Sequence, residues 1–217
     1  MMMSRTIRAE RVGVTREQIL TAAERLFAEY GVCAASNRRI SEAAGQGNTA
    51  AVGYHFGGKA DLVRAIVRRH AEPIEELRAR MVTAADGSGD VRAWVSCMVR
   101  PVTEHLAALG SPTWYARFLA QVGTDPALCE ILDEENRTSP SLRRAVEGFT
   151  RCLPGLPAAV QDERGAMTRQ LILHTCAERE RALARGAATP RASWHDAATG
   201  LIDALVGLWL APPTHPT

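Results

Sequence analysis

Apolar residues recur every three or four positions along most of the chain, and this spacing constrains its fold more than any other feature. It places the apolar residues on one face of an α-helix, whereas a half-buried strand would alternate apolar and polar residues. No segment alternates in that way, and alanine, leucine, arginine and glutamate dominate. Because 46% of the 217 residues are hydrophobic, the chain can bury a substantial core. We therefore predict an all-α fold.

The first third of the chain carries the start and stop signals of several short helices. Thr15 and Gln18 form a capping-box pattern before an apolar stripe that stops at Gly31. Ser36 is the expected N-cap of a second helix. Pro73 falls inside a longer fourth helix, where it removes one hydrogen bond and is expected to cause a kink. The predicted helices span residues 15–30, 36–45, 49–56 and 59–85.

Six more helices are predicted beyond the glycine-rich linker at residues 86–89. Pro112, Pro126 and Pro140 each follow a serine or aspartate, a pattern that places a capping residue before proline at the first helical position. Ser193 with Asp196 repeats the capping-box pattern. These helices are expected near residues 90–109, 112–122, 126–137, 140–152, 157–185 and 193–210.

Charge is distributed unevenly along the chain, although the formal net charge is only +2. Residues 1–70 contain 11 basic and 6 acidic side chains, and the remaining residues contain 15 and 18. A basic N-terminal part on an acidic body suits a protein whose N-terminal part alone meets a polyanion. We divide the chain into a mobile basic arm (1–14), a helix-turn-helix DNA-binding domain (15–70) and a helical sensing and dimerisation domain (71–217).

A known signature runs through the DNA-binding domain. The segment Ser36-Asn-Arg-Arg-Ile40-Ser-Glu-Ala-Ala-Gly45 is followed by Tyr54-His-Phe-Gly-Gly-Lys59-Ala-Asp-Leu62. Over about residues 15–70 this pattern resembles the TetR/AcrR family of repressors. In that family a helix-turn-helix places its second helix in the major groove of DNA. The rest of the chain resembles the family only in the number and size of its helices.

The resemblance implies a set of DNA contacts. Three residues at the start of the recognition helix would face base edges, the others would contact phosphates, and Phe56 would anchor the helix in the core. The implied contacts are Ser36, Arg38, Arg39, Asn48, Thr49, Ala50, Tyr54, His55 and Lys59. Ser41 stands where the family usually has alanine, and Gly53 where many members have an aromatic residue. The segment between Gly45 and His55 is about one residue longer than usual, which leaves the register of residues 46–50 open by one position.

The body contains aromatic, methionine and histidine side chains at helical spacing. Family resemblance places a ligand pocket among these helices, and small-molecule sites are mostly apolar with a few polar groups. The alternative is ordinary core packing. The candidate ligand-binding residues are Trp94, Met98, His105, Trp114, Phe118, Met167, Leu171 and His174.

The final predicted helix carries an apolar face wider than one flank of a single subunit is expected to cover. The resemblance implies that the last two helices of each subunit form a four-helix homodimer interface. The candidate interface residues are Leu201, Ile202, Leu205, Leu208 and Trp209.

The sequence thus predicts a TetR-type regulator, a repressor that a small-molecule effector releases from a palindromic, double-stranded DNA operator. An activator of the same fold and a ligand-independent DNA-binding dimer remain alternatives. We expect no enzymatic activity, because no G-x-S-x-G or H-E-x-x-H motif occurs. Five scattered cysteines without a C-x-x-C pair predict reduced thiols, and no metal or cofactor is expected. No apolar leader or membrane span is evident, so a cytoplasmic location is expected.

Overall fold

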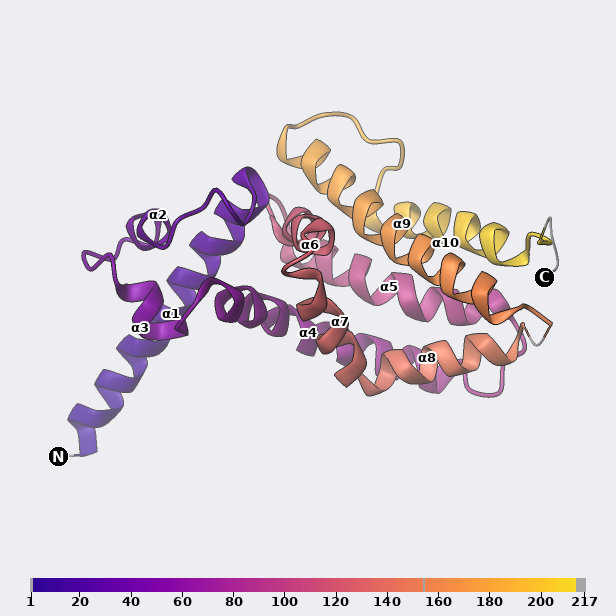
Figure 1. Cartoon of the computed structure of the whole chain (residues 1–217), viewed down its shortest axis with the longest axis horizontal. Helices are drawn as coiled ribbons and strands as arrows, with labels where there is room; N and C mark the ends of the chain where they lie inside the picture. Colours follow the sequence, from indigo (N-terminus) through magenta and orange to yellow (C-terminus); the bar gives the residue numbers. More distant parts are fainter. Residues whose placement is uncertain (1, 154, 214–217) are drawn as a thin grey trace.

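The computed structural model describes residues 2–153 and 155–213, with side chains described from residue 12 onward. Ten helices and no strand occur in these ranges, which confirms the all-α prediction (Figure 1). The helices are α1 (Met2–Tyr30), α2 (Asn37–Ala43), α3 (Ala51–Phe56), α4 (Lys59–Ala84), α5 (Val91–Leu109), α6 (Tyr115–Thr124), α7 (Cys129–Thr138), α8 (Pro140–Arg151), α9 (Ala158–Ala184) and α10 (Trp194–Leu210).

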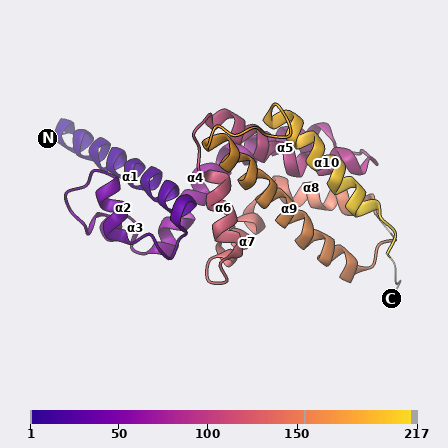
Figure 2. The same ribbon diagram turned by 90° about the horizontal axis from the view of Figure 1, so that it is seen from above.

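The molecule is elongated, with two helical parts joined near its middle. Helices α1 to α3 form one end, which we call the head, and α5 with α8 to α10 form the other, which we call the body (Figures 1 and 2). Helix α4 runs from the head into the body. Among the described residues, no helix combines the length and the apolarity that crossing a bilayer requires.

Local capping signals located several helix starts correctly. Ser36, Ser139 and Ser193 are the N-cap residues of α2, α8 and α10, and each side chain accepts a hydrogen bond from a backbone amide three residues later. The predicted start at Thr15 is wrong, since α1 begins at Met2. No proline interrupts the preceding residues, so the capping pattern falls inside a continuous helix. The mobility of the arm predicted for residues 1–14 stays a prediction.

Helices α6 and α7 begin three residues later than predicted from Pro112 and Pro126. At α6 the reason is a long-range contact. The buried carboxylate of Glu180, on α9, accepts hydrogen bonds from the backbone amides of Ala116 at 3.1 Å and Arg117 at 3.0 Å. Helix N-terminal amides need acceptors, and here a side chain 63 and 64 residues away supplies them.

Two hydrophobic clusters hold the molecule together. The first extends from α1 to α6 and α9, and within it the rings of Phe27 and Phe118 stack with centroids 6.1 Å apart. The second joins α5, α8 and α10 around Trp94, Phe149 and Trp209. The core of the head therefore continues into the body through α6, in addition to the covalent connection through α4.

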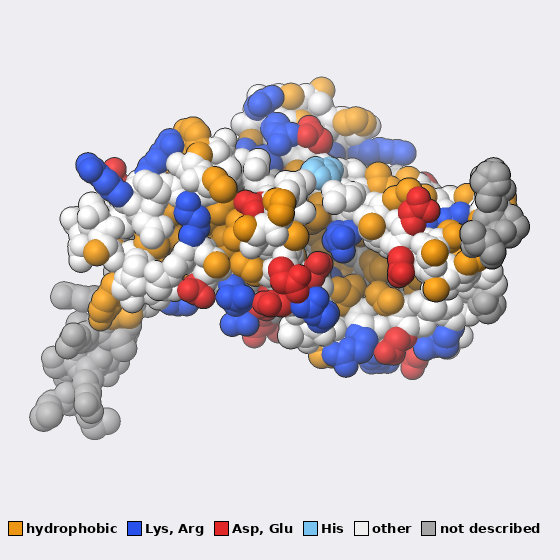
Figure 3. All heavy atoms as spheres, viewed as in Figure 1, with side chains coloured by type: hydrophobic (Ala, Val, Ile, Leu, Met, Phe, Trp, Pro, Cys, Tyr) orange, Lys and Arg blue, Asp and Glu red, His pale blue; other side chains and the backbone are white. Residues whose placement is uncertain are grey.

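Helix α7 is also held against α4 by charged side chains. Arg64 and Arg68 on α4 pair with Glu134 at 3.0 Å and with Glu135 at 2.9 Å. Figure 3 shows acidic and basic side chains mingled over the middle of the molecule on this face. Because most of these groups are partly exposed, each pair contributes modestly to stability.

Candidate nucleic-acid interface and internal cavity

The turn between α2 and α3 is fixed by short-range hydrogen bonds. Gly45 adopts a positive φ of 68°, which lets the chain turn after α2. Asn48 Oδ1 accepts a hydrogen bond from the amide of Ala50 at 2.9 Å, and Ser41 Oγ donates to the carbonyl of Thr49 at 3.3 Å. Asn48, Thr49 and Ala50 are exposed as a result, directly before the first residue of α3.

Helix α3 is anchored from one side and exposed on the other. Phe56 is buried, and the guanidinium of Arg16 on α1 lies 4.2 Å from the centre of its ring. Arg16 also donates a hydrogen bond to the carbonyl of His55 at 2.8 Å. Tyr54 is 78% exposed, and its ring meets the half-buried His55 ring edge-on. The helix therefore presents Tyr54 to the surroundings on a fixed backbone.

The basic residues of the head differ in how far they are already engaged. Lys59 Nζ donates to the carbonyl oxygens of Val32 at 2.9 Å and Cys33 at 3.3 Å, so it ties the α1–α2 connection to the start of α4. The Arg39 guanidinium lies 3.9 Å from the centre of the Tyr30 ring. Arg38 is largely exposed and pairs with Glu42 at 2.8 Å. The nine predicted DNA contacts lie on α2, α3, the turn between them and the start of α4.

A short helix, a fixed turn and a second short helix with an exposed N-terminal end define a helix-turn-helix head, the class that docks into DNA grooves. Residues 19–66 match the sequence profile of a family described as bacterial regulatory proteins, tetR family. The head of this chain is therefore similar to the DNA-binding part of TetR-family regulators.

A curated relative matches the head alone. The HTH-type transcriptional repressor AcnR of Corynebacterium glutamicum is 40% identical over 63 residues, which are 29% of this chain and 33% of AcnR. The chain thus spans about a third of the length of this relative.

Two solved structures cover nearly the whole chain at low identity. One, from Mesorhizobium loti and described as a TetR-family transcriptional regulator, is 14% identical, covers 91% of this chain and 98% of its own, and has a TM-score of 0.48. The TetR-family regulator PfmR of Thermus thermophilus is 18% identical, covers 92% and 98%, and also has a TM-score of 0.48.

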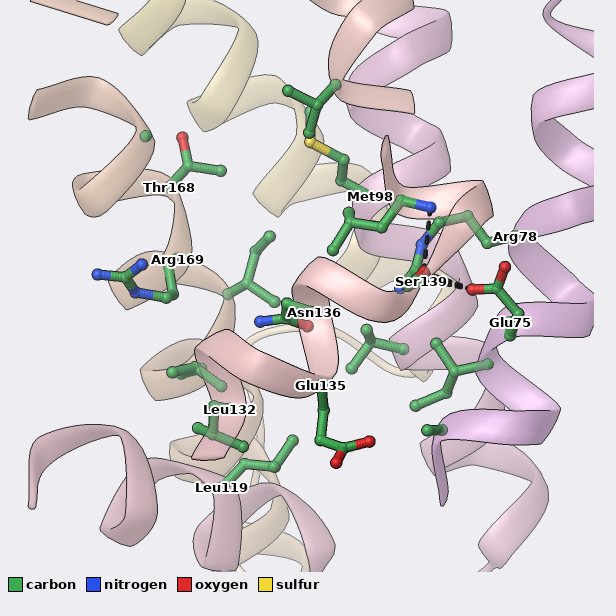
Figure 4. A pocket seen from close by; sticks show the side chains of 18 of the residues that line it. Glu75, Arg78, Met98, Leu119, Leu132, Glu135, Asn136, Ser139, Thr168 and Arg169 are labelled. Atoms are coloured by element: carbon green, nitrogen blue, oxygen red, sulfur yellow. Dashed lines mark hydrogen bonds and ion pairs between the residues drawn. The ribbon is translucent and has the colours of Figure 1, made fainter. Parts of the chain in front are cut away.

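The body contains a half-open cavity of about 870 Å³ lined by residues of the helices from α4 to α10, within the size range of small-molecule sites (Figure 4). Its walls are mainly apolar, as such sites usually are. The apolar lining includes Met98, Leu119, Leu132, Phe149, Ile172 and Trp209. Of the eight residues predicted to bind a ligand, Met98 is the one that lines this cavity.

Four of the predicted ligand residues pack in the core instead. Trp94 is 1% exposed, and its ring lies so close to Gly148 that an added Cβ there would approach it to 2.5 Å. Phe118 belongs to the first cluster, Trp114 packs partly buried against it, and the ring nitrogen of buried His105 is bonded to His70. Aromatic periodicity alone could not separate these core positions from a cavity wall.

The remaining three predicted ligand residues lie on the outer surface of the body. Met167, Leu171 and His174 are exposed on α9, and none of them lines the cavity. Their regular spacing places them on one face of α9, but that face points away from the cavity.

Sequence reasoning missed a polar cluster at the cavity wall. Glu75 on α4 accepts hydrogen bonds from the hydroxyls of Ser139 and Ser141 and from the amide of Ser141 at 2.8 Å. Burial raises the pKa of Glu75, but these hydrogen bonds outweigh burial, so the pKa lies below its ordinary value. Arg78, one turn further along α4, is buried and lines the same cavity. The three-residue spacing of Glu75 and Arg78 could have indicated this cluster from the sequence, because residues three apart lie on the same face of a helix.

The predicted dimer residues are mostly buried inside the subunit. Leu201, Ile202, Leu205 and Trp209 are at most 7% exposed and belong to the second cluster, while Leu208 is partly buried against it. Within the subunit α5 packs on α10 and covers these side chains, so their role in a dimer contact stays a prediction. The exposed residues in the second half of α10 are Asp203, which pairs with Arg92, together with Ala204, Gly207 and Leu210.

Proposed function

We propose that this protein is a transcription regulator that binds a double-stranded DNA operator as a homodimer and responds to a small-molecule effector in its body. One observation carries the proposal: the N-terminal end of α3 and Tyr54 are exposed on a rigid helix-turn-helix of the TetR family. In this class the second helix enters the major groove, while flanking residues contact phosphates. Asn48, Thr49 and Ala50 then read bases.

The remaining DNA contacts surround the recognition helix. Ser36, Arg38 and Arg39 on the α2 side, together with Tyr54, His55 and Lys59, contact the phosphate backbone. Lys59 is already bonded to two carbonyl oxygens, so at most one of its three N–H donors reaches a phosphate. Its main contribution is to hold the α1–α2 connection against α4, which keeps the groove-facing surface in place.

Two heads of a homodimer read the two halves of a palindrome about one helical turn, roughly 34–36 Å, apart. The exposed faces of α9 and α10 support this assembly, since α9 exposes Met167 and Leu171 and α10 exposes the small residues Ala204 and Gly207. Small residues allow two helices to approach closely. AcnR is named a repressor, and we carry repression over as part of this proposal.

The effector acts through α4. Glu75 and Arg78 at the cavity and Lys59 at the head lie on this one helix, and the 19 residues between Lys59 and Arg78 span about 28 Å at 1.5 Å per residue. A ligand that shifts α4 at the cavity therefore moves the base of the head. The Phe27–Phe118 contact between α1 and α6 provides a second mechanical connection. The cavity supports this sensing function over a ligand-independent dimer.

A selection of genomic DNA fragments by the full-length protein tests the proposal. We expect specific fragments with an inverted repeat, bound with a Kd of about 10⁻⁸ M or lower and with strong salt dependence. Tyr54→Ala should weaken binding at least tenfold without changing thermal stability, because the side chain is exposed. Arg80→Ala, an exposed charge removal on α4 outside the head, is the matched control and should change affinity less than twofold.

Failure of the wild type to enrich any fragment, or equal binding by Tyr54→Ala, would contradict the proposal. A reporter gene placed behind the recovered operator then separates repression from activation. Lower expression in the presence of the protein supports a repressor, and higher expression supports the activator alternative.

A further inference from the structure

We propose that the effector of this protein is an apolar molecule with a single terminal carboxylate, which Arg78 binds inside the cavity. This inference rests on the proposed function, because it assigns the chemical class of ligand to the sensing cavity. It is carried by the hydrogen bonds of Arg78, by those of Glu75 and by the composition of the cavity walls.

Arg78 is a buried cation whose hydrogen-bonding capacity is poorly used. Its side chain is 9% exposed, and it lines the cavity. Nη1 donates to Ser139 Oγ at a long 3.3 Å, and the buried Nε has no hydrogen-bond partner in the part of the chain that the structure describes. A guanidinium presents five N–H donors, and a buried donor without a partner is costly. The terminal Nη groups, rather than this buried Nε, are the donors that a ligand acceptor in the cavity can reach.

The neighbouring carboxylate forms an ion pair with Arg78 but accepts no hydrogen bond from it. The nearest oxygen of Glu75 lies 3.6 Å from Nη1, beyond hydrogen-bond range. Both oxygens of Glu75 are instead occupied by Ser139 and Ser141 at the start of α8. Figure 4 shows Arg78, Ser139 and Glu75 together at one side of the cavity. Glu75 is therefore held by α8, and Arg78 remains the group that can receive an anion.

The other charges around the cavity lie near its edge, where Glu72 and Asp162 are exposed and two arginines are paired. Arg68 bonds to Glu135 at 2.9 Å, and Arg169 lies 3.5 Å from Asp133, with both arginines at least half exposed. The interior surface between these pairs and Arg78 is mainly aliphatic and aromatic. This distribution fits a ligand with a long apolar part and a single charged end.

The charge of the ligand's polar end group follows from the charges of Arg78 and Glu75. A guanidinium binds a carboxylate through two parallel hydrogen bonds. A cationic end group would be repelled by Arg78. A dianionic phosphate would be repelled by Glu75 more strongly than a monoanionic carboxylate, because it brings two negative charges to a single guanidinium. A monoanionic carboxylate is the end group that matches one available guanidinium.

Calorimetry on the full-length protein without DNA tests the inference. The probes are saturated straight-chain carboxylic acids of 6 to 16 carbons and, at the best length, the matching primary alcohol, primary amine and alkyl phosphate. We expect the acid to bind at least tenfold more tightly than each of the other three. Arg78→Gln should remove that preference, whereas Arg169→Gln at the cavity edge should change it less than threefold.

Several results would overturn the inference. The first is that no acid of the series binds with a Kd below 1 mM. The second is that the alcohol, amine or phosphate binds as tightly as the acid. The third is that the Arg78→Gln protein folds and keeps the preference for the acid. If Arg78→Gln does not fold, Arg78→Lys replaces it and should lower the acid preference at least threefold, because lysine lacks the planar fork.

A separate DNA titration distinguishes this inference from the proposed function. If the acid binds but the operator affinity is unchanged, the carboxylate site stands and the sensing function fails. If the operator is bound specifically but no acid binds, the regulator stands and the carboxylate assignment fails.

Discussion

His70 Nδ1 lies 2.8 Å from His105 Nε2, deep between the head and the body. His70 Nε2 lies 2.9 Å from Glu24 Oε2, so the three side chains form one buried chain of hydrogen bonds across α1, α4 and α5. With Glu24 ionised, the chain is satisfied when each imidazole is neutral and carries its proton on Nε2. His105 then donates to His70, and His70 donates to Glu24. The Tyr115 ring stacks on His70 at 3.8 Å and covers the network.

This network predicts acid sensitivity of folding. Burial, together with His70 and more weakly Arg69, lowers the pKa of His105 to about 4, against the partial opposition of Glu24. An unfolded histidine has a pKa of about 6.5, so between these two values the unfolded state binds more protons. Stability from the neutral His105 is therefore complete above about pH 6.5 and is lost as pH falls toward 4. The total loss is about 3 kcal/mol.

Urea unfolding between pH 7.5 and 4.5 measures this effect. The free energy of unfolding should fall by up to about 1.4 kcal/mol per pH unit from this one group, and His105→Gln should flatten the slope below pH 6.5. His174→Gln, a substitution at an exposed histidine on α9, is the control and should retain the wild-type slope. Identical slopes for His105→Gln and the wild type would contradict the prediction.

Lys59→Met should destabilise the head, because the carbonyl oxygens of Val32 and Cys33 lose a charged donor. The expected loss is about 1–2 kcal/mol in urea unfolding, compared with less than about 0.5 kcal/mol for Arg80→Met on the exposed side of α4. DNA titrations of the same variant at several salt concentrations add a second readout. A slope of log K against log salt that falls by about 0.9 assigns a phosphate to Lys59. An unchanged slope limits Lys59 to supporting the fold.

Adjacent substitutions on α10 should separate dimerisation from folding. Ala204 is exposed, so Ala204→Glu places a charge on the proposed contact face and should convert the dimer into a folded monomer with unchanged helical content. Leu205 is 0% exposed, so Leu205→Ala leaves a cavity within the subunit and should cost about 2–5 kcal/mol. Light scattering measures the mass and chemical unfolding measures the stability. A dimeric Ala204→Glu protein would exclude this face as the contact.

Glu180→Gln should be strongly destabilising. Glu180 is 1% exposed and accepts from two amides at the start of α6 and from Arg117 Nε at 3.0 Å. Removing its charge leaves the buried Arg117 guanidinium uncompensated, at an expected cost of about 3–5 kcal/mol. Glu178→Gln, in a largely exposed pair with Arg181, should change stability by less than about 0.5 kcal/mol. Equal losses for the two variants would show that the buried pair has no special role.

The all-α fold, most helix ends and the helix-turn-helix could be predicted from the sequence because their signals are local. A serine cap such as Ser139 acts on an amide three residues away, and a glycine such as Gly31 ends its own helix. The same local reasoning failed at Thr15, where continuous helix-forming sequence overrode a capping pattern. It failed again at α6, whose first amides bond to Glu180 on a distant helix.

The cavity and the exposed face of α10 were decided by tertiary packing. Helical spacing shows that Trp94 and Leu205 lie on apolar faces, but it cannot show which neighbouring helix covers each face. Trp94 is buried because Gly148 makes room for its ring, and Leu205 because α5 packs on α10. Arg78 illustrates the same limit. A buried arginine looks like any exposed one in the sequence, and only the positions of Glu75, Ser139 and Ser141 leave its guanidinium poorly paired. Such pairings join residues more than 60 positions apart, and local chemistry does not determine them.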